Sequence, residues 1–324
     1  MSVLDTIKEP VKEELKEFEH IFRHSLKSKI PLLNLVMNFI IRRKGKQIRP
    51  ILVFLSAKLT GNIRPSTYIA ASLIEMLHTA SLIHDDVVDD SYERRNYFSV
   101  NALWKSKMAV LIGDYLLAQG MLISVKNNEY DILRIVSDAV REMSEGELLQ
   151  MQESRKLAIT EEKYFEIIRK KTATLISSCA ASGAKSVEAP DEIVAQMARF
   201  GEYMGIAFQI QDDLLDYQEK SATGKPSGND IKERKITLPL IYALQNASSH
   251  ERRRILSMIN KRNSNAQTLS EVIAFIKSKG GFDYSNQKMN EYREKSLSLL
   301  DTFPDSPSKN SLREFAFFIT SRKQ

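Results

Sequence analysis

Four aspartates gather in the stretch LIHDDVVDDSYERRN, at the end of a mostly apolar run that begins at Ala71. They are Asp85, Asp86, Asp89 and Asp90. If the run is helical, Asp85 and Asp89 lie one above the other on one face, where like charges repel by roughly 0.2–0.5 kcal/mol. Burial against apolar neighbours would cost more, so a cation is expected. The alternative is a solvated acidic helix end.

The same D-D-x-x-D spacing returns at Asp212, Asp213 and Asp216, again at the end of an apolar helical run. Two copies are hard to explain as solvated helix faces. Two helices that present these clusters to each other would line a cavity with at least six carboxylates. Hard oxygen ligands of this kind, together with a phosphate substrate, indicate Mg²⁺.

Positive charge accompanies both clusters. The basic residues concerned are Lys46 and Arg49 before a predicted helix, Arg94 and Arg95 after the first cluster, and Lys225 and Lys235 after the second. Guanidinium groups match phosphate geometry, and a helix start with free N–H groups favours anions. The alternatives are simple neutralisation of the aspartates and, around Lys46, a solvated turn.

Two further polar residues stand in apolar helical segments. His78 lies on the face of Asp85, two turns earlier, and Lys171-Thr172 opens the segment KTATL. A lone histidine in an apolar helix is more often a satisfied core residue, and a lysine can extend to the surface. Their positions relative to the aspartates favour a functional role.

The composition excludes several classes of protein. The 324 residues carry 47 Lys and Arg against 41 Asp and Glu, a net charge of +6. These basic residues are scattered and suit a small anionic substrate better than nucleic acid. Cys179 is the single cysteine, which excludes intrachain disulfides and a multi-cysteine zinc site and fits a cytoplasmic protein. No signal-peptide core or transmembrane run is expected, although a lipophilic product could be delivered at a membrane surface.

The elements that must position these residues are helices, because apolar residues recur at helical spacing almost everywhere. Residues 10–25 form an amphipathic pattern. Thr160 is a predicted helix cap, Thr268 with Glu271 forms a predicted capping box, and Ser306 precedes a first-turn proline. The sequence therefore predicts an all-α chain with short connections.

Six motifs, in this order and spacing, resemble those of the trans-isoprenyl (polyprenyl) diphosphate synthases, long-chain type. They are GK-x-x-RP from Gly45, the first aspartate motif with its two arginines, GDYLL from Gly113, KTA from Lys171, FQ-x-x-DD-x-x-D from Phe208, and GKP-x-G-x-D with K-x-TLP from Gly224. The resemblance covers essentially the whole chain. It implies one domain over residues 1–324, a large helical bundle around a deep central cavity, and a homodimer.

The resemblance also implies roles for individual residues. The ligands of about three Mg²⁺ ions would be Asp85, Asp89 and Asp212, supported by Asp86, Asp213 and Asp216. The allylic diphosphate would be held by Arg94, Lys171, Lys225 and Lys235. The pocket for isopentenyl diphosphate would comprise Lys46, Arg49, His78 and Arg95. The groups facing the developing allylic cation would be Thr172 and Gln209.

The implied reaction begins with ionisation of the allylic C1–O bond, helped by metals and lysines that stabilise the departing diphosphate. The isopentenyl double bond attacks C1, and loss of a proton, with the diphosphate as favoured acceptor, restores an alkene. Three positions depart from the usual pattern, namely Gln47, Asn96 and Arg234. None replaces a catalytic carboxylate, so an active enzyme is expected.

Product length should depend on the helix that carries the first cluster. Ser81 and Ala80 lie about one turn, roughly 5.4 Å, deeper than Asp85. In short-chain members of the family this level tends to carry aromatic residues, whereas both side chains here are small. The tail should continue toward Leu77, Met76 and Leu73, which predicts a product longer than farnesyl or geranylgeranyl, of the kind used for quinone side chains.

Four other functions are consistent with parts of the sequence. A short-chain synthase shares every catalytic motif. A terpene cyclase would lack the isopentenyl diphosphate pocket, and a metal-dependent phosphohydrolase suggested by His84-Asp85 would need more well-spaced histidines. A non-catalytic subunit of a heteromeric synthase would have lost a carboxylate cluster, and both are intact.

Overall fold

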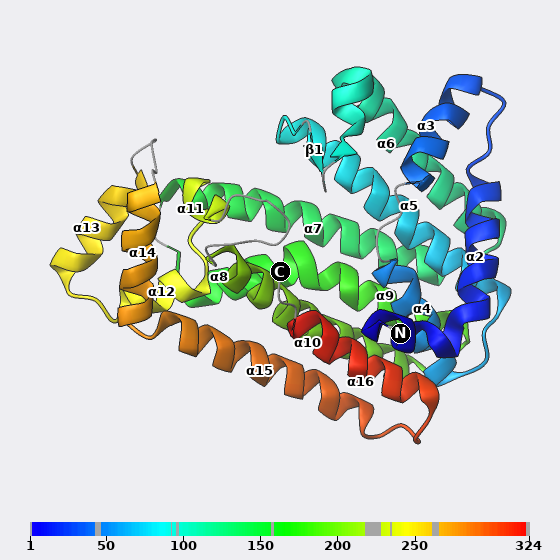
Figure 1. Cartoon of the computed structure of the whole chain (residues 1–324). Helices are drawn as coiled ribbons and strands as arrows, with labels where there is room; N and C mark the ends of the chain where they lie inside the picture. The colour runs from blue at the N-terminus through cyan, green and yellow to red at the C-terminus, as the bar shows by residue number, and fades with distance from the viewer. Residues whose placement is uncertain are drawn as a thin grey trace. The chain divides into compact units, whose positions relative to one another are not determined.

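The computed structural model describes residues 2–42, 47–91, 93–94, 97–156, 159–217, 228–233, 235–260 and 266–321. Its long helices are labelled in Figure 1. In chain order the elements are α1 (Val3–Lys8), η1 (Glu9–Val11), α2 (Lys12–Ser25), α3 (Pro31–Arg42), α4 (Ile48–Thr60), α5 (Pro65–Val88), β1 (Glu93–Arg94), β2 (Tyr97–Phe98), α6 (Val100–Lys126), α7 (Tyr130–Lys156), α8 (Glu161–Ile168), η2 (Arg169–Ala173), α9 (Thr174–Ser186), α10 (Asp191–Asp216), α11 (Asn229–Lys232), α12 (Leu238–Gln245), α13 (Ser249–Asn260), α14 (Ala266–Ser278), α15 (Gly281–Leu300) and α16 (Pro307–Thr320).

The prediction of an all-α protein is confirmed. The exception among the described residues is a two-residue antiparallel hairpin, β1 with β2, in which Glu93 pairs with Phe98. One helix of the described chain, α6, is long and apolar enough to cross a membrane, and a third of its most apolar window is buried. A single helix of this kind also occurs in soluble proteins, so it is weak evidence for a membrane span.

The predicted helix starts are partly confirmed. The Thr160 side chain accepts from the Lys163 N–H at 3.3 Å and caps α8. Ser306 likewise accepts from the Lys309 N–H at 3.2 Å, before α16 begins at Pro307. The capping box at Thr268 is wrong, because α14 already begins at Ala266 and Thr268 lies inside it. A Ser/Thr-x-x-Glu pattern cannot distinguish a cap from a position inside the first turn.

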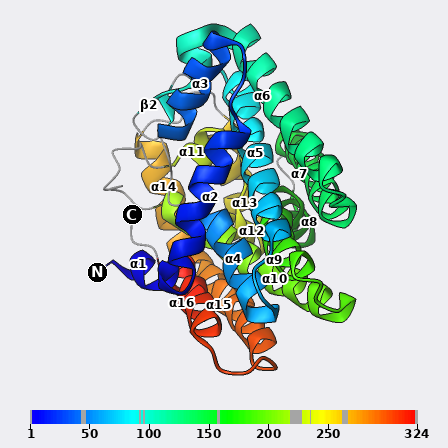
Figure 2. The same ribbon diagram turned by 90° about the vertical axis from the view of Figure 1, so that its right-hand side faces the viewer.

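The chain separates into two compact units, which are described one at a time. The first comprises Met1–Val140, Ser178–Ala198 and Phe303–Leu312. In it α5 packs against α6, α4 and α2 (Figure 2). Its core includes Val36 and Met37 of α3, Met76 and Ala80 of α5, and Leu116 of α6.

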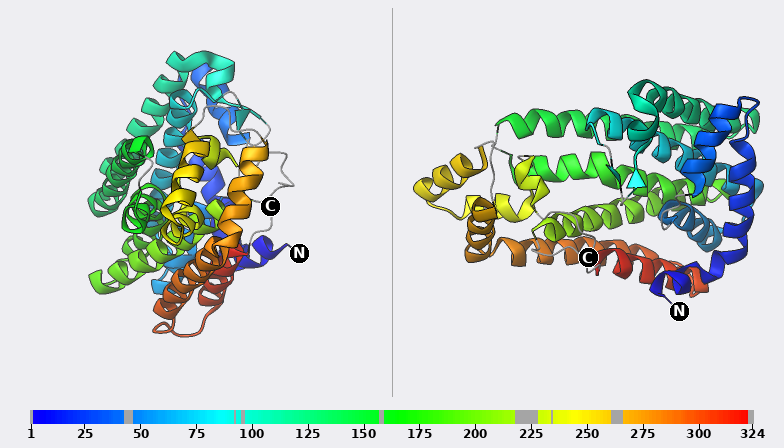
Figure 3. Two further views of the ribbon diagram at one scale, coloured as in Figure 1. Left: turned by 90° about the vertical axis from the view of Figure 1, so that its left-hand side faces the viewer. Right: turned by 45° about the horizontal axis from the view of Figure 1, so that its top comes forward.

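The second unit comprises Arg141–Ser177, Arg199–Thr302 and Arg313–Gln324. Figure 3 shows the short helices α12, α13 and α14 gathered at one end of α15, and α12 and α14 both contact α15. A separate apolar cluster fills this unit, drawn from α8, α10, α12, α13, α14 and α15. The expectation of one domain over residues 1–324, with a deep central cavity, stays a prediction.

Candidate functional site: two aspartate clusters

The first aspartate cluster lies where α5 ends. Asp89 caps the end of the helix, where its N–H donates to the Asp85 carbonyl at 2.8 Å and the Ser91 N–H donates to the Asp86 carbonyl at 2.9 Å. Asp90 follows with a φ of 48°, in the left-handed region, which turns the chain away. Asp85 and Asp89 are exposed whereas Asp86 is buried. The predicted pair of metal ligands is therefore accessible, and Asp86 is placed to support them.

The histidine before this cluster explains the GDYLL motif. A side chain at Gly113 would put its Cβ 2.1 Å from His84 Nε2, so only glycine leaves room for the imidazole. His84 Nε2 also lies 3.3 Å from the Val110 carbonyl oxygen and 3.5 Å from an Asp114 carboxylate oxygen. Contacts with α6 thus fix the last turn of α5, directly beside Asp85.

The predicted isopentenyl diphosphate pocket is only partly described. Lys46, Arg95 and Lys225 lie outside the described residues, as do Asn96 and Arg234, and of Arg94 only the backbone in β1 is described. Arg49 lies in the first turn of α4 and His78 in α5. Gln47 precedes α4 in a left-handed conformation with a φ of 52°. The predicted contacts of these residues with a diphosphate stay predictions.

The single cysteine lies in the first unit. Cys179 is fully buried, as expected of a packing residue. Burial raises the pKa of its thiol to about 12, although the positive charge of Arg49 acts in the opposite direction. It therefore stays a neutral thiol.

The predicted chain-length residues divide between two environments. Met76 and Ala80 are fully buried in the core of the first unit, and Leu77 is 5% exposed. Ser81 is half-buried, and its hydroxyl donates to the His78 carbonyl at 2.9 Å. The small Ala80 side chain belongs to the same apolar cluster as Ile112 and Leu116 of α6. The path of a product tail past this level stays a prediction.

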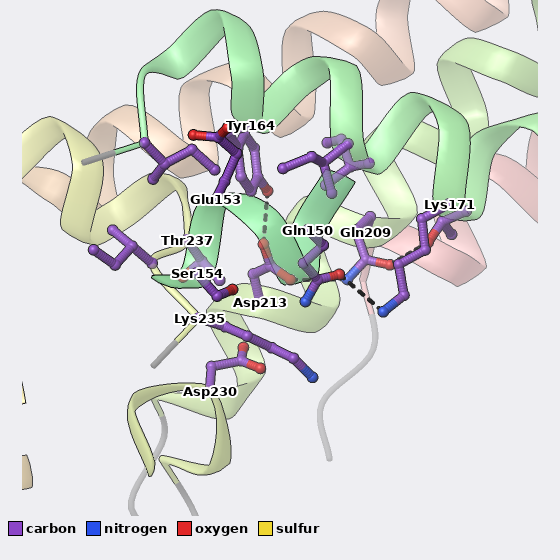
Figure 4. Close-up of a pocket in the computed structure, with 15 residues that line it drawn as sticks. Gln150, Glu153, Ser154, Tyr164, Lys171, Gln209, Asp213, Asp230, Lys235 and Thr237 are labelled. Carbon is purple, nitrogen blue, oxygen red and sulfur yellow. Dashed lines mark hydrogen bonds between the residues drawn. The ribbon is translucent and has the colours of Figure 1, made fainter. Parts of the chain in front are cut away.

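The second cluster borders a cavity of about 110 Å³ inside the second unit (Figure 4). Its lining includes five residues predicted for the site, namely Lys171, Thr172, Gln209, Asp213 and Lys235. The structure thus brings together side chains from η2, from α10 and from the segment before α12.

Asp213 is held on both sides. Its Oδ2 accepts from the Tyr164 hydroxyl at 2.7 Å, and its Oδ1 accepts from Gln209 Nε2 at 2.8 Å. Burial, followed by the charge of the nearby Asp230, raises the pKa of Asp213 to about 8, against the effect of these two hydrogen bonds. Asp212 and Asp216, on either side of it in sequence, are half-buried.

Asp216 connects α10 to the short helix α11. Its Oδ2 accepts from the Asp230 N–H at 2.9 Å, and its carbonyl accepts from the Gly228 N–H at 2.8 Å. Gly228 has a φ of 74°, a conformation that favours glycine. Burial, followed by the charge of Asp216, raises the pKa of Asp230 to about 7.

Lys235 brings a positive charge to the same lining. Its N–H donates to the Asp230 carbonyl at 2.7 Å, and its Nζ pairs with Glu233 at 2.5 Å. Burial alone would lower the pKa of Lys235, but the hydrogen bond that it donates to Glu233 and the surrounding acids raise it. The lysine therefore stays charged beside Asp230.

Lys171 and Thr172 lie in a π-helical turn, η2, and not in a regular α-helix. Lys171 Nζ donates to Gln150 Oε1 at 2.8 Å and pairs with Glu147, so it does not simply extend into solvent. Two glycines confine this turn. A Cβ at Gly146 would lie 2.7 Å from the Lys171 nitrogen, and one at Gly205 would lie 2.6 Å from the Ala173 Cα. Single π turns are often found at functional sites.

Sequence reasoning missed Tyr164 as a member of the site. It lies seven residues before Lys171, which places it two turns away on the same side of the helical run. It is 3% exposed and reaches Asp213 across the cavity. Asp230, the last residue of the GKP-x-G-x-D motif, has no role predicted from the sequence, and its contact with Asp216 joins residues 14 positions apart in the chain.

The donor set fits Mg²⁺ by its chemistry. Among the described residues no three acidic or histidine side chains form a ready metal cluster. The second unit nevertheless brings carboxylates close together, because the Asp230 N–H donates to Asp216 Oδ2 and Asp213 lines the same cavity as Asp230. Carboxylate oxygens are the ligands that a hard divalent cation prefers.

Three curated relatives match almost the whole chain. An all-trans-nonaprenyl-diphosphate synthase (geranyl-diphosphate specific) of Rhodobacter capsulatus is 36% identical over 94% of this chain and 93% of its own. The octaprenyl diphosphate synthase of Escherichia coli (strain K12) is 32% identical over 98% and 99%. Component 2 of a heptaprenyl diphosphate synthase of Bacillus subtilis (strain 168) is 32% identical over 96% and 88%.

Solved structures agree. A decaprenyl diphosphate synthase from Rhodobacter capsulatus has a TM-score of 0.92 at 33% identity, covering 98% of each chain. A polyprenyl synthase from Caulobacter crescentus CB15, complexed with calcium and isoprenyl diphosphate, has a TM-score of 0.89 at 29% identity, covering 99% and 98%. A geranylgeranyl pyrophosphate synthase from Bacteroides thetaiotaomicron has a TM-score of 0.84 at 38% identity, covering 99% and 100%.

The polyprenyl synthetase family profile matches residues 30–276, which contain both aspartate clusters and the cavity lining. This match and the relatives above confirm the resemblance inferred from the motifs. The chain belongs to the polyprenyl synthetase family, whose members are prenyltransferases.

Proposed function

We propose that this chain condenses isopentenyl diphosphate with an allylic diphosphate and makes a long-chain all-trans polyprenyl diphosphate. The observation that carries the proposal is the cavity of the second unit, where Lys171, Thr172 and Gln209 meet Asp213. This combination joins a cation that can bind diphosphate, uncharged oxygens that can face a carbocation, and carboxylates that can hold metal.

The residues have separate tasks in this proposal. Asp85, Asp89 and Asp212 would hold Mg²⁺, about three ions per site, with Asp86, Asp213 and Asp216 in support. The metal would supply charge neutralisation of the leaving diphosphate. Lys171 and Lys235 would add positive charge beside that diphosphate, together with Arg94 and Lys225. Lys46, Arg49, His78 and Arg95 would hold the second diphosphate, that of isopentenyl diphosphate.

The chemistry needs no side-chain base. The allylic C1–O bond breaks and its electron pair leaves with the diphosphate. The double bond of isopentenyl diphosphate then forms a new bond to C1, and a proton leaves the resulting cation to the released diphosphate. The oxygens of Thr172 and Gln209 would stabilise the positive charge while it exists.

A long product is supported by small side chains at Ala80 and Ser81, and by relatives described as nonaprenyl and octaprenyl synthases. A cavity of about 110 Å³ is smaller than the ~300–1,000 Å³ of typical ligand sites. It would take the reacting end of the substrate. The residues proposed to set the product length lie on α5. A quinone side chain is the proposed use of such a product.

A homodimer is supported by the outer face of α6. Exposed apolar side chains recur along it, namely Leu103, Val110, Leu111, Met121, Leu122 and Val125. Exposed apolar side chains gathered on one helix are the kind of surface that an interface covers. The proposed location is the cytoplasm. Sedimentation of the pure chain alone would contradict the homodimer if it showed monomers.

One experiment tests the function. Purified chain, Mg²⁺ and labelled isopentenyl diphosphate are incubated with allylic primers of increasing length, and product length is measured by chromatography. Products longer than geranylgeranyl are expected, and Asp212→Asn should abolish them. A product that ends at geranylgeranyl would favour the short-chain alternative, which the Bacteroides thetaiotaomicron structure keeps open. No elongation with any primer would leave a non-catalytic subunit as the better reading.

A further inference from the structure

A continuous chain of hydrogen bonds crosses the cavity of the second unit (Figure 4). It begins at the Tyr164 hydroxyl, which donates to Asp213 Oδ2 at 2.7 Å. Asp213 Oδ1 then accepts from Gln209 Nε2 at 2.8 Å, and Gln209 Oε1 accepts from the Thr172 hydroxyl at 2.7 Å. Three elements contribute to the chain, because Tyr164 lies in α8, Thr172 in η2, and the other two residues in α10.

Tyr164 is the rigid end of this chain. Its ring belongs to the apolar core of the second unit, and it meets the Phe165 ring edge-on at 5.4 Å between centroids. Burial and the neighbouring Asp213 raise the pKa of Tyr164 well above its usual value, so the phenol keeps its proton. A tyrosine in this state always presents a donor at the same point.

The direction of these hydrogen bonds follows from which groups donate and which accept. Both Asp213 oxygens accept, one from the Tyr164 hydroxyl and the other from Gln209 Nε2, so Asp213 faces the NH₂ end of the Gln209 amide. The amide oxygen then points to Thr172, whose hydroxyl donates its proton to it. This leaves the lone pairs of the Thr172 oxygen and the second lone pair of Gln209 Oε1 to face the cavity.

We propose that Tyr164 is a positioning residue for the prenyl transfer: through Asp213 it fixes the amide orientation of Gln209 and, with it, the oxygens that face the allylic cation. This inference rests on the proposed function. It assigns Tyr164 no contact with substrate. Without the Tyr164 hydroxyl, the Asp213 carboxyl group is free to rotate. The buried core then no longer fixes the direction of the hydrogen bonds from Asp213 to Thr172.

The test compares Tyr164→Phe with a matched control, Tyr284→Phe. Tyr284 also donates to a carboxylate of α8, Glu161 Oε1 at 2.6 Å, but neither residue lines the cavity. Both changes keep the ring and remove one hydrogen bond. We expect the kcat of Tyr164→Phe to fall about tenfold, which corresponds to about 1.4 kcal/mol, with KM for both diphosphates within twofold. The kcat of Tyr284→Phe should stay within twofold of the original.

Two further measurements separate positioning from general stability. Thermal stabilisation by Mg²⁺ with inorganic pyrophosphate should be retained in Tyr164→Phe, because the predicted metal ligands are untouched. In a Gln209→Leu background, the Tyr164→Phe change should alter kcat less than twofold, since the residue through which it acts is already lost. If Tyr164→Phe does not fold, the same double-mutant comparison is made with Asp213→Asn, whose effect on kcat should shrink in the Gln209→Leu background. Because Asp213 is also proposed to support the metal ligands, thermal stabilisation by Mg²⁺ with pyrophosphate is measured alongside and should be retained.

The outcomes are distinct. If the unmodified chain elongates no primer, the proposed function fails and this inference falls with it. If the unmodified chain is active and Tyr164→Phe has the kcat of the Tyr284→Phe control, the inference alone is overturned. Equal losses in the original and Gln209→Leu backgrounds would also overturn it, because Tyr164 would then act independently of Gln209.

Discussion

Gly205 of α10 sets how closely η2 can approach, and replacing it by alanine should disable catalysis more than folding. The added Cβ would lie 2.6 Å from the Ala173 Cα and 2.9 Å from its Cβ. Both atoms belong to Ala173, which has no side-chain rotation that could move them away, so η2 must move by about 0.8 Å to restore ordinary contact. Misplacement by about 1 Å can cost 10²-fold in rate. We expect a fall in kcat of ten- to a hundredfold.

Gly201→Ala is the matched control. It lies one turn earlier in α10, and its Cβ would meet the Ile176 carbonyl oxygen at 2.6 Å and the Ser177 Cα at 2.7 Å, outside the cavity lining. Overpacking of this kind costs about 1–3 kcal/mol in either variant. Urea unfolding measures that loss, and incorporation of labelled isopentenyl diphosphate at saturating substrate measures kcat. Equal kcat losses in the two variants, or none in Gly205→Ala, would refute the reasoning.

Three other predictions concern charge, product length and packing. Because the folded pKa of Asp213 is raised from 3.8 to about 8, the folded state binds the proton more tightly than the unfolded state. Its contribution therefore lowers the free energy of unfolding as pH rises from about 4 to about 8. Urea titrations without metal should show this loss of unfolding free energy in the unmodified chain and a smaller loss in Asp213→Asn. Adding Mg²⁺ and pyrophosphate to the unmodified chain should also make the loss smaller. If the difference in unfolding free energy between the two proteins does not change with pH, the prediction is contradicted. Ser81→Phe, at a half-buried position, should shorten the product because it places a ring one turn below Asp85. Chromatography of the products measures this, and an unchanged product length would contradict the proposal that α5 sets the length. Gly113→Ala should destabilise the first unit by about 1–3 kcal/mol, because the added Cβ would lie 2.1 Å from the His84 ring. Gly120→Ala is the control, since its nearest contact is the end of the Leu73 side chain at 3.0 Å. It should lower the free energy of unfolding less in the same urea assay.

Much of the candidate site could be predicted because the informative patterns are local. D-D-x-x-D places carboxylates on one helix face whatever the tertiary structure, and helical periodicity alone predicts the all-α class. The motifs also identified the family, since their order along the chain is a property of the sequence. The helix that carries the first aspartate cluster follows from the same local rules.

The tertiary structure decided what lies around each motif. That Lys171 and Thr172 occupy a π turn depends on Gly146 and Gly205, which come from two other helices. That Asp213 is buried between Tyr164 and Gln209, while Asp85 is exposed, could not be inferred from two clusters with identical spacing. Hydrogen bonding and burial depend on which segments meet in space, and a one-dimensional pattern contains only the neighbours along the chain. The sequence by itself therefore determined which residues carry the chemistry. The fold decided which of them are buried, which are fixed by hydrogen bonds, and which line the cavity.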